Sequence, residues 1–330
     1  MSDSNSKLSL AICGLGRFAT RRILPAIAAC PNVELVAVVD RSGKASGLPP
    51  GTRRFESLEH FLDTRPTGAV YVATPNYLHA QHSVQCLEAG LHVLCEKPMA
   101  TNSRDCQVMV DAARKMNLHL KVGHMLRHSP ALQLARRWLQ NGLIGEPRAI
   151  CTLFHYDLPE NLRPWASRQD FAGGGVLMDA GIHCIDTIRF LLGDPVILLG
   201  AMTDRPAQAN SVEHGAACRF TAGGVISFVQ VCSQAPYFTR LSVSGTNGEV
   251  VIDNFAACWG KAKVKLYAHQ TGNAGCAVKE EMVDVSMIYS EQIRNFADAI
   301  GGSEVDISEP LDAAENVRIV EKLYELSHRS

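Results

Sequence analysis

An acid and a histidine stand four residues apart in the apolar segment GGGVLMDAGIHCIDTIRFLL, which covers residues 173–192. The spacing predicts that Asp179 and His183 lie one turn apart on the same face of a helix. In that relation a carboxylate and an imidazole share a proton path, or the acid holds the imidazole in one tautomer. The rest of the segment is mostly apolar and is expected to be buried. Two ionisable groups in it therefore indicate either a functional site or a satisfied pair in the core.

A glycine-rich segment, residues 14–19, follows the apolar run 8–13, which predicts a buried strand. The letters GLGRFA fit the pattern G-x-G-x-x-G/A, and a helical pattern comes next. Gly14 allows a tight turn, Gly16 lets the backbone approach a pyrophosphate, and Ala19 allows close packing of helix on strand. This order predicts a dinucleotide site; the alternative is a plain tight turn between strand and helix.

An acid ends the next predicted strand, residues 33–40. Asp40 lies about 20 residues beyond the glycines, where an acid accepts hydrogen bonds from the adenosine ribose. It favours NAD, because its charge repels a 2′-phosphate. Arg41 leaves NADP open, since an arginine can pair with that phosphate or stack on adenine. A solvated surface arginine is the other interpretation of Arg41.

Further apolar runs at 69–73, 92–95 and 118–122 alternate with helical patterns. Such alternation predicts a doubly wound parallel sheet. Ligands of these sheets bind beyond the carboxyl ends of the strands. The residues that fall at this edge are Thr74, Pro75, Asn76, Glu96, Lys97, Pro98 and His124.

The second half of the chain has a different pattern, with short apolar or alternating runs separated by turns that contain Gly or Asn. We therefore predict a Rossmann domain over residues 1–125 and an α+β domain over 126–330 with a large, mostly antiparallel, open-faced sheet. The expected strands cover 147–156, 196–202, 215–220, 225–232, 239–244, 249–252 and 263–268, and the expected helices cover 287–300 and 310–327. The open face is expected to pair with another subunit unless helices of the same chain cover it.

The composition excludes several classes of protein. A net charge of −1 over 330 residues gives no basic surface for nucleic acid or membrane. The eleven cysteines form no CxxC pair and no cluster with zinc spacing, so we expect no metal, no disulfide scaffold and a reducing cytoplasm. The polar N-terminus gives no reason to expect a signal peptide.

The chain resembles the Gfo/Idh/MocA family of NAD(P)-dependent oxidoreductases, named for glucose–fructose oxidoreductase and inositol dehydrogenase. The resemblance covers nearly the whole sequence. It is carried by the segments GLGRFA (14–19), ATPNYLHA (73–80), EKPMA (96–100), VGHMLRHSP (122–130), GGGVLMDAGIHCIDTIRFLLG (173–193) and GTNGEV (245–250).

The resemblance implies that Lys97, Asp179 and His183 are the catalytic lysine, aspartate and histidine. It also implies that the peptide bond before Pro98 is cis. The expected cofactor-binding residues are Gly14, Gly16, Arg17, Phe18, Ala19, Asp40, Arg41, Thr74, Pro75, Asn76, His79, Glu96, Lys97 and Pro98. Residues expected at the substrate are His124, Arg127, Tyr156, Trp165 and Arg168, with Tyr237 as a weaker candidate.

We therefore predict a cytoplasmic dehydrogenase that transfers a hydride between NAD or NADP and a secondary alcohol of a sugar, polyol or related carbohydrate. His183 is the expected general base, with Lys97 as the alternative, and the family implies a homodimer or homotetramer built through the open sheet. Two other functions stay open. One is a non-catalytic dinucleotide-binding sensor, which would not need all three catalytic residues. The other is an enzyme of the same scaffold acting on a different kind of substrate.

Overall fold

The computed structural model of the protein describes residues 7–41, 47–157, 159, 163–193, 195–204, 210–268, 277–303 and 309–327. The chain forms two compact units. One consists of Met1–His124 with Tyr289–Val317, and the other of Met125–Ile288 with Arg318–Ser330. The segment Tyr289–Val317 thus joins the first unit although it lies late in the chain, and the boundary between the units falls within the last helix.

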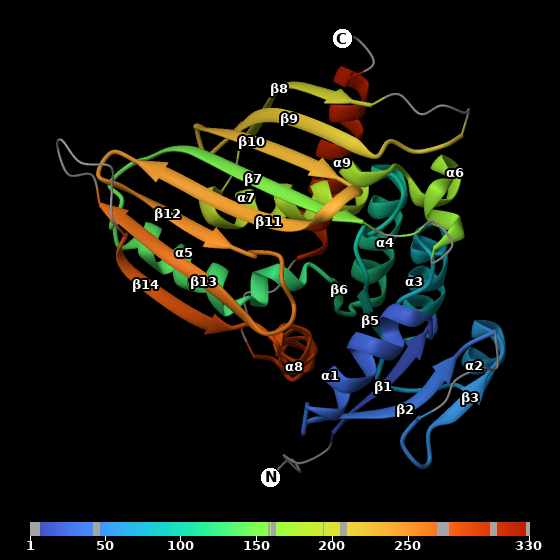
Figure 1. Ribbon diagram of the computed structural model, residues 1–330. Coiled ribbons are helices and arrows are strands. Elements are labelled where there is room, and N and C mark those ends of the chain that lie inside the picture. The colour runs from blue at the N-terminus through green and yellow to red at the C-terminus, as the bar shows by residue number, and fades with distance from the viewer. Residues whose placement is uncertain are drawn as a thin grey trace. The chain divides into compact units, whose positions relative to one another are not determined.

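The first unit is built on a six-stranded parallel sheet with the strand order β3-β2-β1-β4-β5-β6 (Figure 1). Reversal of the strand order between β1 and β4 is the feature that places ligand sites in doubly wound folds. The central strands are almost entirely buried, as expected for a parallel sheet covered on both faces. The strands are β1 (Leu8–Cys13), β2 (Val33–Val39), β3 (Arg53–Phe55), β4 (Ala69–Val72), β5 (His92–Cys95) and β6 (Leu120–Val122).

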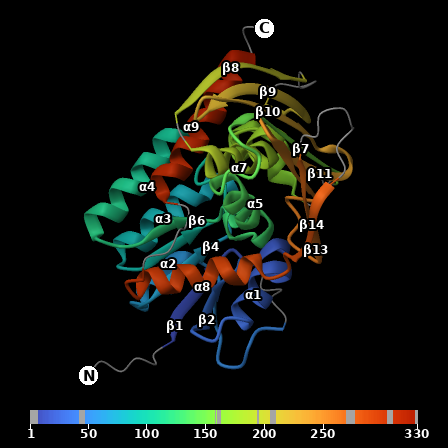
Figure 2. The ribbon, with the colours of Figure 1, turned by 90° about the vertical axis from the view of Figure 1, so that its left-hand side faces the viewer.

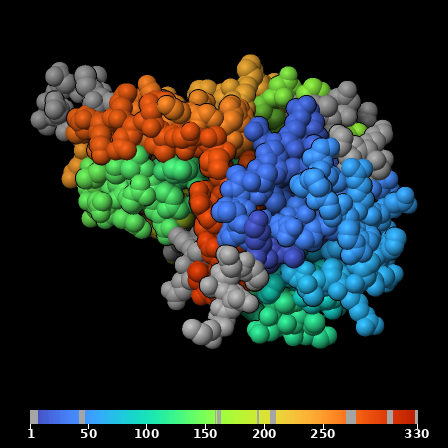
Figure 3. All heavy atoms as spheres, turned by 90° about the horizontal axis from the view of Figure 1, so that it is seen from below, coloured from blue at the N-terminus to red at the C-terminus, as the bar shows by residue number. Residues whose placement is uncertain are grey.

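The helices of this unit are α1 (Leu24–Ala28), α2 (Leu58–Asp63), α3 (His79–Glu88), α4 (Ser103–Met116) and α8 (Ile288–Ile300). All residues of α8 except the first, Ile288, belong to this unit. Helix α8 lies beside α1 and the turn after it (Figure 2). The Cys30 thiol contacts the Ser290 carbonyl at 3.3 Å, and the Asn32 amide donates to Asp298 at 3.1 Å. From below, the orange-red atoms of α8 lie against the blue N-terminal segments (Figure 3). A late segment therefore completes the core of the N-terminal sheet.

The second unit is built on an eight-stranded sheet with the order β14-β13-β12-β11-β7-β10-β9-β8 (Figure 1). Only β7 and β10 pair in parallel; the other pairs are antiparallel. The predicted fold class is therefore confirmed for both halves of the chain. The strands are β7 (Pro147–Asp157), β8 (Val196–Thr203), β9 (Gly215–Ala222), β10 (Val225–Cys232), β11 (Gln234–Gly245), β12 (Gly248–Asp253), β13 (Lys261–Ala268) and β14 (Ala277–Asp284).

Helices of the same unit cover one face of this sheet. Helix α5 (Pro130–Gln140) packs on β13 and β14, and α7 (Ile182–Leu192) packs on β7, β9 and β10. Two further helices are α6 (Gln169–Ala172) and α9 (Pro310–Ser327). Large apolar side chains stand exposed along the strands, among them Ile197, Met202, Ile226, Phe228, Phe238 and Met282. The strand register places these six on one face.

The structure differs from the predicted elements in a few places. The segment 173–192 is not one α-helix, because a π-helical turn over Leu177–Gly181 precedes α7. Strands β3 and β14 and helices α2 and α5 were not predicted. Strand β3 has only three residues, two of them exposed arginines, and β14 carries four charged residues among eight. Neither strand therefore has the apolar periodicity from which strands are predicted.

Candidate active site

The turn after β1 has the backbone that a dinucleotide requires. Gly14 has φ +95°, and a Cβ there would lie 2.7 Å from the carbonyl oxygen of Ala73, so only glycine fits. A Cβ on Gly16 would meet nothing within 4 Å, which leaves open space beside the backbone. Ala19 is buried, whereas Arg17 and Phe18 are exposed, with Phe18 packed edge-on against Tyr289 at 5.6 Å. The turn fits the expected pyrophosphate.

The two residues that bear on the choice of cofactor follow β2. Asp40 is half-buried, and its backbone N–H donates to the Phe55 carbonyl at 2.9 Å. Arg41 is exposed. The acid therefore lies at the carboxyl edge of the sheet, as predicted. Together, Asp40 and Arg41 are compatible with the adenosine ribose of NAD and with that of NADP.

His79 joins the ends of two neighbouring strands. Its ring nitrogens lie 2.8 Å from the carbonyl oxygens of Thr74, after β4, and of Pro98, after β5. Burial lowers the pKa of His79 to about 4, so the ring is neutral near pH 7 and donates to only one of the two carbonyls. The peptide bond between Lys97 and Pro98 is cis, as the resemblance implies.

A buried chain of polar groups lies behind Lys97. The Tyr71 hydroxyl donates to the Glu96 carboxylate, the Lys97 backbone N–H approaches the same carboxylate at 3.2 Å, and Gln292 donates to Tyr71 at 3.3 Å. Burial raises the pKa of Glu96 to about 7, although Tyr71 and Lys97 both favour its charged form. Glu96 therefore changes charge near neutral pH, next to the residue proposed to act on substrate. His124 is also buried in this unit, with Nε2 3.3 Å from the Asn316 amide.

In the second unit, Glu213 and Tyr324 hold the start of the helix that carries Asp179 and His183. The Glu213 carboxylate accepts from the backbone N–H groups of Gly175 and Leu177, both at 2.9 Å, and from the Tyr324 hydroxyl at 2.7 Å. This arrangement explains two of the three glycines. A Cβ on Gly174 would lie 2.3 Å from the Tyr324 hydroxyl, and one on Gly175 only 2.1 Å from the Glu213 carbonyl oxygen.

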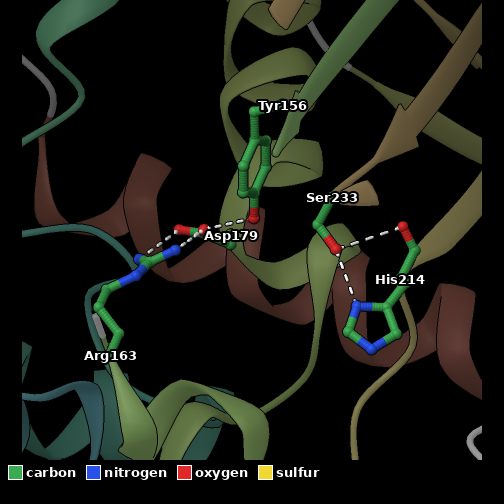
Figure 4. Close-up of polar contacts among 5 residues, drawn as sticks. All are labelled: Tyr156, Arg163, Asp179, His214 and Ser233. Carbon is green, nitrogen blue, oxygen red and sulfur yellow. Dashed lines mark hydrogen bonds and ion pairs between the residues drawn. The ribbon is translucent and has the colours of Figure 1, made fainter. Parts of the chain in front are cut away.

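Asp179 accepts hydrogen bonds from two residues of the adjoining strand and loop (Figure 4). The Tyr156 hydroxyl donates at 2.7 Å, and the Arg163 guanidinium lies 2.6 Å from one carboxylate oxygen and 3.4 Å from the other. The Asp179 charge raises the pKa of Arg163, while burial and then the same charge raise that of Tyr156. Both partners therefore stabilise Asp179 as an anion.

His183 is the second residue of α7 and is buried against β7. Its ring stacks on Phe154 with centroids 6.1 Å apart and planes inclined by 24°. Phe154 also contacts Tyr156 edge-on at 6.0 Å, so the neighbourhoods of Asp179 and His183 share the end of β7. The structure thus brings Tyr156, Asp179 and His183 to one end of this sheet. The role of Asp179 as the group that orients His183 stays a prediction.

The other residues expected at the substrate have partners of their own. Arg127 is buried and forms three hydrogen bonds of 2.7–3.1 Å with Asp186. Trp165 lies in a 3₁₀ turn, with the Arg163 guanidinium 6.0 Å from its ring. Arg168 is exposed and pairs with Asp170 at 2.6 Å.

Three polar residues at this end of the sheet were missed by the sequence analysis. Arg163 lies in the loop after β7, and His214 and Ser233 lie before β9 and after β10, where His214 Nδ1 is 3.0 Å from Ser233 Oγ (Figure 4). Arg163 precedes Pro164 and Trp165 in a loop already regarded as part of the site, and that position was the available signal. For His214 and Ser233 the sequence offers none, because only the strand order brings them to the end of β7.

Comparison with known proteins identifies the family of the chain. Residues 8–124 match a family model described as an oxidoreductase family with an NAD-binding Rossmann fold, and residues 132–251 match the C-terminal domain of the same family. The fold and the site define an NAD(P)-dependent oxidoreductase. The chain belongs to the Gfo/Idh/MocA family, which confirms the prediction.

Its relatives include two sugar reductases. A 1,5-anhydro-D-fructose reductase from Ensifer adhaerens is 33% identical over 59% of this chain and 60% of that protein. A dTDP-3,4-didehydro-2,6-dideoxy-alpha-D-glucose 3-reductase from Saccharopolyspora spinosa is 30% identical over 74% of each. An aldose–aldose oxidoreductase from Caulobacter crescentus, solved with glycerol, has a TM-score of 0.85 at 26% identity and covers 98% of both chains.

Two further findings concern the described part of the chain. No helix there is both long enough and apolar enough to cross a membrane. No group of three or more His, Cys, Asp or Glu side chains among those residues is arranged to hold a metal ion.

Proposed function

We propose that this protein transfers a hydride between NAD or NADP and a secondary alcohol or ketone of a sugar, polyol or related carbohydrate. The observation that carries the proposal is the Asp179 carboxylate, held as an anion by Tyr156 and Arg163 four residues before His183. The relatives named as reductases of anhydrofructose and of a nucleotide-linked deoxyglucose support a carbohydrate substrate. A levoglucosan dehydrogenase, 30% identical over 55% of this chain, supports the same class.

The cofactor would be held by the glycine turn and by the ends of the neighbouring strands. The residues proposed for this role are Gly14, Gly16, Arg17, Phe18, Ala19, Asp40, Arg41, Thr74, Pro75, Asn76, His79, Glu96, Lys97 and Pro98. When bound, the nicotinamide supplies the acceptor or donor of the hydride. Asp40 favours NAD because its carboxylate would repel a 2′-phosphate, and Arg41 keeps NADP possible.

The chain's own residues handle the proton and the charge of the reacting oxygen. His183 takes the hydroxyl proton, because an imidazole titrates near neutral pH. Asp179 stays ionised and stabilises the imidazolium that forms. Lys97 hydrogen-bonds the same oxygen and stabilises its developing negative charge; as the alternative, Lys97 itself accepts the proton. Tyr156 and Trp165 are proposed to contact the substrate.

The test is the absorbance of reduced nicotinamide with a panel of polyols, inositols and aldoses, offered with NAD and with NADP. His183→Ala and Lys97→Ala should each lower turnover by 10² to 10⁴-fold, roughly what general acid–base groups contribute. Fluorescence titration with the reduced cofactor should give unchanged binding in His183→Ala and thus show that this variant is folded. Full turnover in His183→Ala would remove it from the role of base. Cofactor binding without turnover across the panel would favour a dinucleotide-binding sensor.

A second copy of the chain is proposed to cover the open face of the sheet, as a homodimer or within a homotetramer. The register brings Ile226 and Phe228 of β10 onto this face, and charged pairs such as Lys265–Asp253 at 2.9 Å lie on the same face farther along the sheet, on β13 and β12. An apolar strip with a charged margin is typical of a protein interface. Sedimentation should show an oligomer for the wild type and dissociation for Phe228→Glu. The matched control is Val108→Glu on α4 of the other unit, and dissociation of both variants alike would argue against this face.

The described cysteines form no disulfide, and most of them are buried. Free thiols in this number support the proposed location in a reducing cytoplasm.

A further inference from the structure

Two half-exposed aromatic side chains lie beside each other in the second unit. Tyr237 and Trp259 are 41% and 49% exposed, with ring centroids 5.4 Å apart and planes tilted by 43°. Tyr237 lies near the start of β11, and Trp259 lies in the loop between β12 and β13. Because β7 and β12 run antiparallel to β11, both residues belong to the end of the sheet where β7 finishes.

Ring contacts connect this pair to His183. Tyr237 packs edge-on against Phe154 with centroids 6.4 Å apart, and Phe154 stacks on His183 at 6.1 Å. We call these four residues, His183, Phe154, Tyr237 and Trp259, the aromatic row. His183 is buried, Phe154 is partly buried, and the two outer members reach solvent. A substrate ring at His183 and a second ring linked to it could therefore both contact the row.

Hydrogen bonds to Thr239 and a buried phenylalanine hold the loop that carries Trp259 in place. The Asn254 N–H donates to the Thr239 carbonyl at 2.8 Å, and the Ala256 N–H donates to the Thr239 hydroxyl at 3.3 Å. Phe255 is fully buried and packs edge-on against Phe154 at 6.3 Å. A surface fixed in this way before a ligand arrives loses little conformational entropy on binding.

We propose that Tyr237 and Trp259 form a subsite for a second sugar ring, so that the substrate is a glycoside whose first ring reacts at His183. This inference rests on the proposed function. Tyr and Trp combine an apolar ring face with a polar tip, which suits a sugar ring with one C–H face and hydroxyls at its edge.

The chain provides a matched control in the next residue. Phe238 is 44% exposed, close to the value for Tyr237, but it contacts His155, whereas Tyr237 contacts Phe154. Neighbouring strand residues point to opposite faces, so Phe238 belongs to the open face and Tyr237 to the aromatic row. The pairing of β11 with β7 also shifts register between Gln234 and Phe238, and such irregularities redirect side chains next to sites.

The experiment compares glucose and galactose with maltose, cellobiose and lactose, using tryptophan fluorescence for binding to the full protein with cofactor and nicotinamide absorbance for turnover. At least one disaccharide should bind about 10-fold more tightly than its monosaccharide in the wild type. Trp259→Ala and Tyr237→Ala should remove that advantage by raising KM while kcat stays within about 2-fold. Trp259→Phe should keep part of it, and Phe238→Ala should keep all of it.

Three results would overturn the subsite. One is the lack of any disaccharide advantage in the wild type. The second is an equal loss for monosaccharide and disaccharide in Trp259→Ala. The third is an advantage through Trp259 that only a nucleoside-diphosphate sugar enjoys, which would assign the pair to a base. Monosaccharide turnover that does not depend on Trp259 would leave the proposed function intact, whereas the lack of any sugar turnover would count against that function itself.

Discussion

The buried ion pair between Arg127 and Asp186 lends itself to a quantitative test. The two side chains are 7% and 2% exposed, and the shortest of their three hydrogen bonds is 2.7 Å. Removing one partner of such a pair leaves an uncompensated buried charge and costs about 3–5 kcal/mol. Arg127→Met or Asp186→Leu alone should therefore lower the free energy of unfolding by about that amount. The double variant should come within about 1 kcal/mol of the wild type, because two apolar side chains then fill the same space.

Urea denaturation of the four proteins, followed by circular dichroism, gives the double-mutant cycle. Turnover in the double variant then separates two roles of Arg127. If the arginine only holds Asp186, KM and kcat return to near wild-type values together with stability. If it contacts the substrate, stability returns but KM stays high. A loss of stability in the double variant equal to the sum of the losses in the two single variants would refute the argument, since it would mean that the two charges do not depend on each other.

Three other predictions follow from the same kind of reasoning. Burial raises the pKa of Glu96 from 4.5 to about 7, so the folded state keeps this proton to a higher pH than the unfolded state does. The contribution of Glu96 to the free energy of unfolding should therefore fall by about 3 kcal/mol from pH 4.5 to 7, and the difference between wild type and Glu96→Gln in pH-dependent urea melts should change by that amount. Gly175→Ala places a Cβ against the Glu213 carbonyl and should cost roughly 2–3 kcal/mol, whereas Gly200→Ala, whose nearest neighbour is 3.6 Å away, should cost under 1 kcal/mol by the same melts. Asp40→Ala should weaken NAD about 10-fold and NADP less in fluorescence titrations, and equal losses would show that Asp40 does not contact the ribose.

The sequence predicts the elements that have strong periodicity or clear end signals. Strand β5 and helix α9 begin and end where the sequence places them. The parallel sheet follows from its near-continuous apolar strands, because both faces are covered. By contrast, the packing of α8 on α1 has no signal in either segment, since it depends on contacts between residues about 260 positions apart.

The candidate site was only partly predictable for the same reason. Glycine types and spacing indicate the turn at Gly14, because the backbone conformation itself requires glycine. The glycines before Asp179 also stand out in the sequence, but the reason that glycine is needed there does not. That reason is the close approach of Glu213 and Tyr324, which come from distant segments of the chain. Arg163 is similar, because its importance comes from the 2.6 Å contact with Asp179 rather than from its own residue type.

The surroundings of His183 show why residue spacing alone does not identify the acid that acts with it. Two acids flank it, Asp179 four residues before and Asp186 three residues after, and both spacings bring side chains together on a helix. Asp186 is almost completely buried and bound to Arg127, whereas the Asp179 side chain is 25% exposed at the end of β7. An acid that supports catalysis must lie where substrate can reach its neighbourhood, while a buried pair satisfies the core. Exposure and the identity of the arginine partner therefore distinguish the two acids and favour Asp179 as the one that acts with His183.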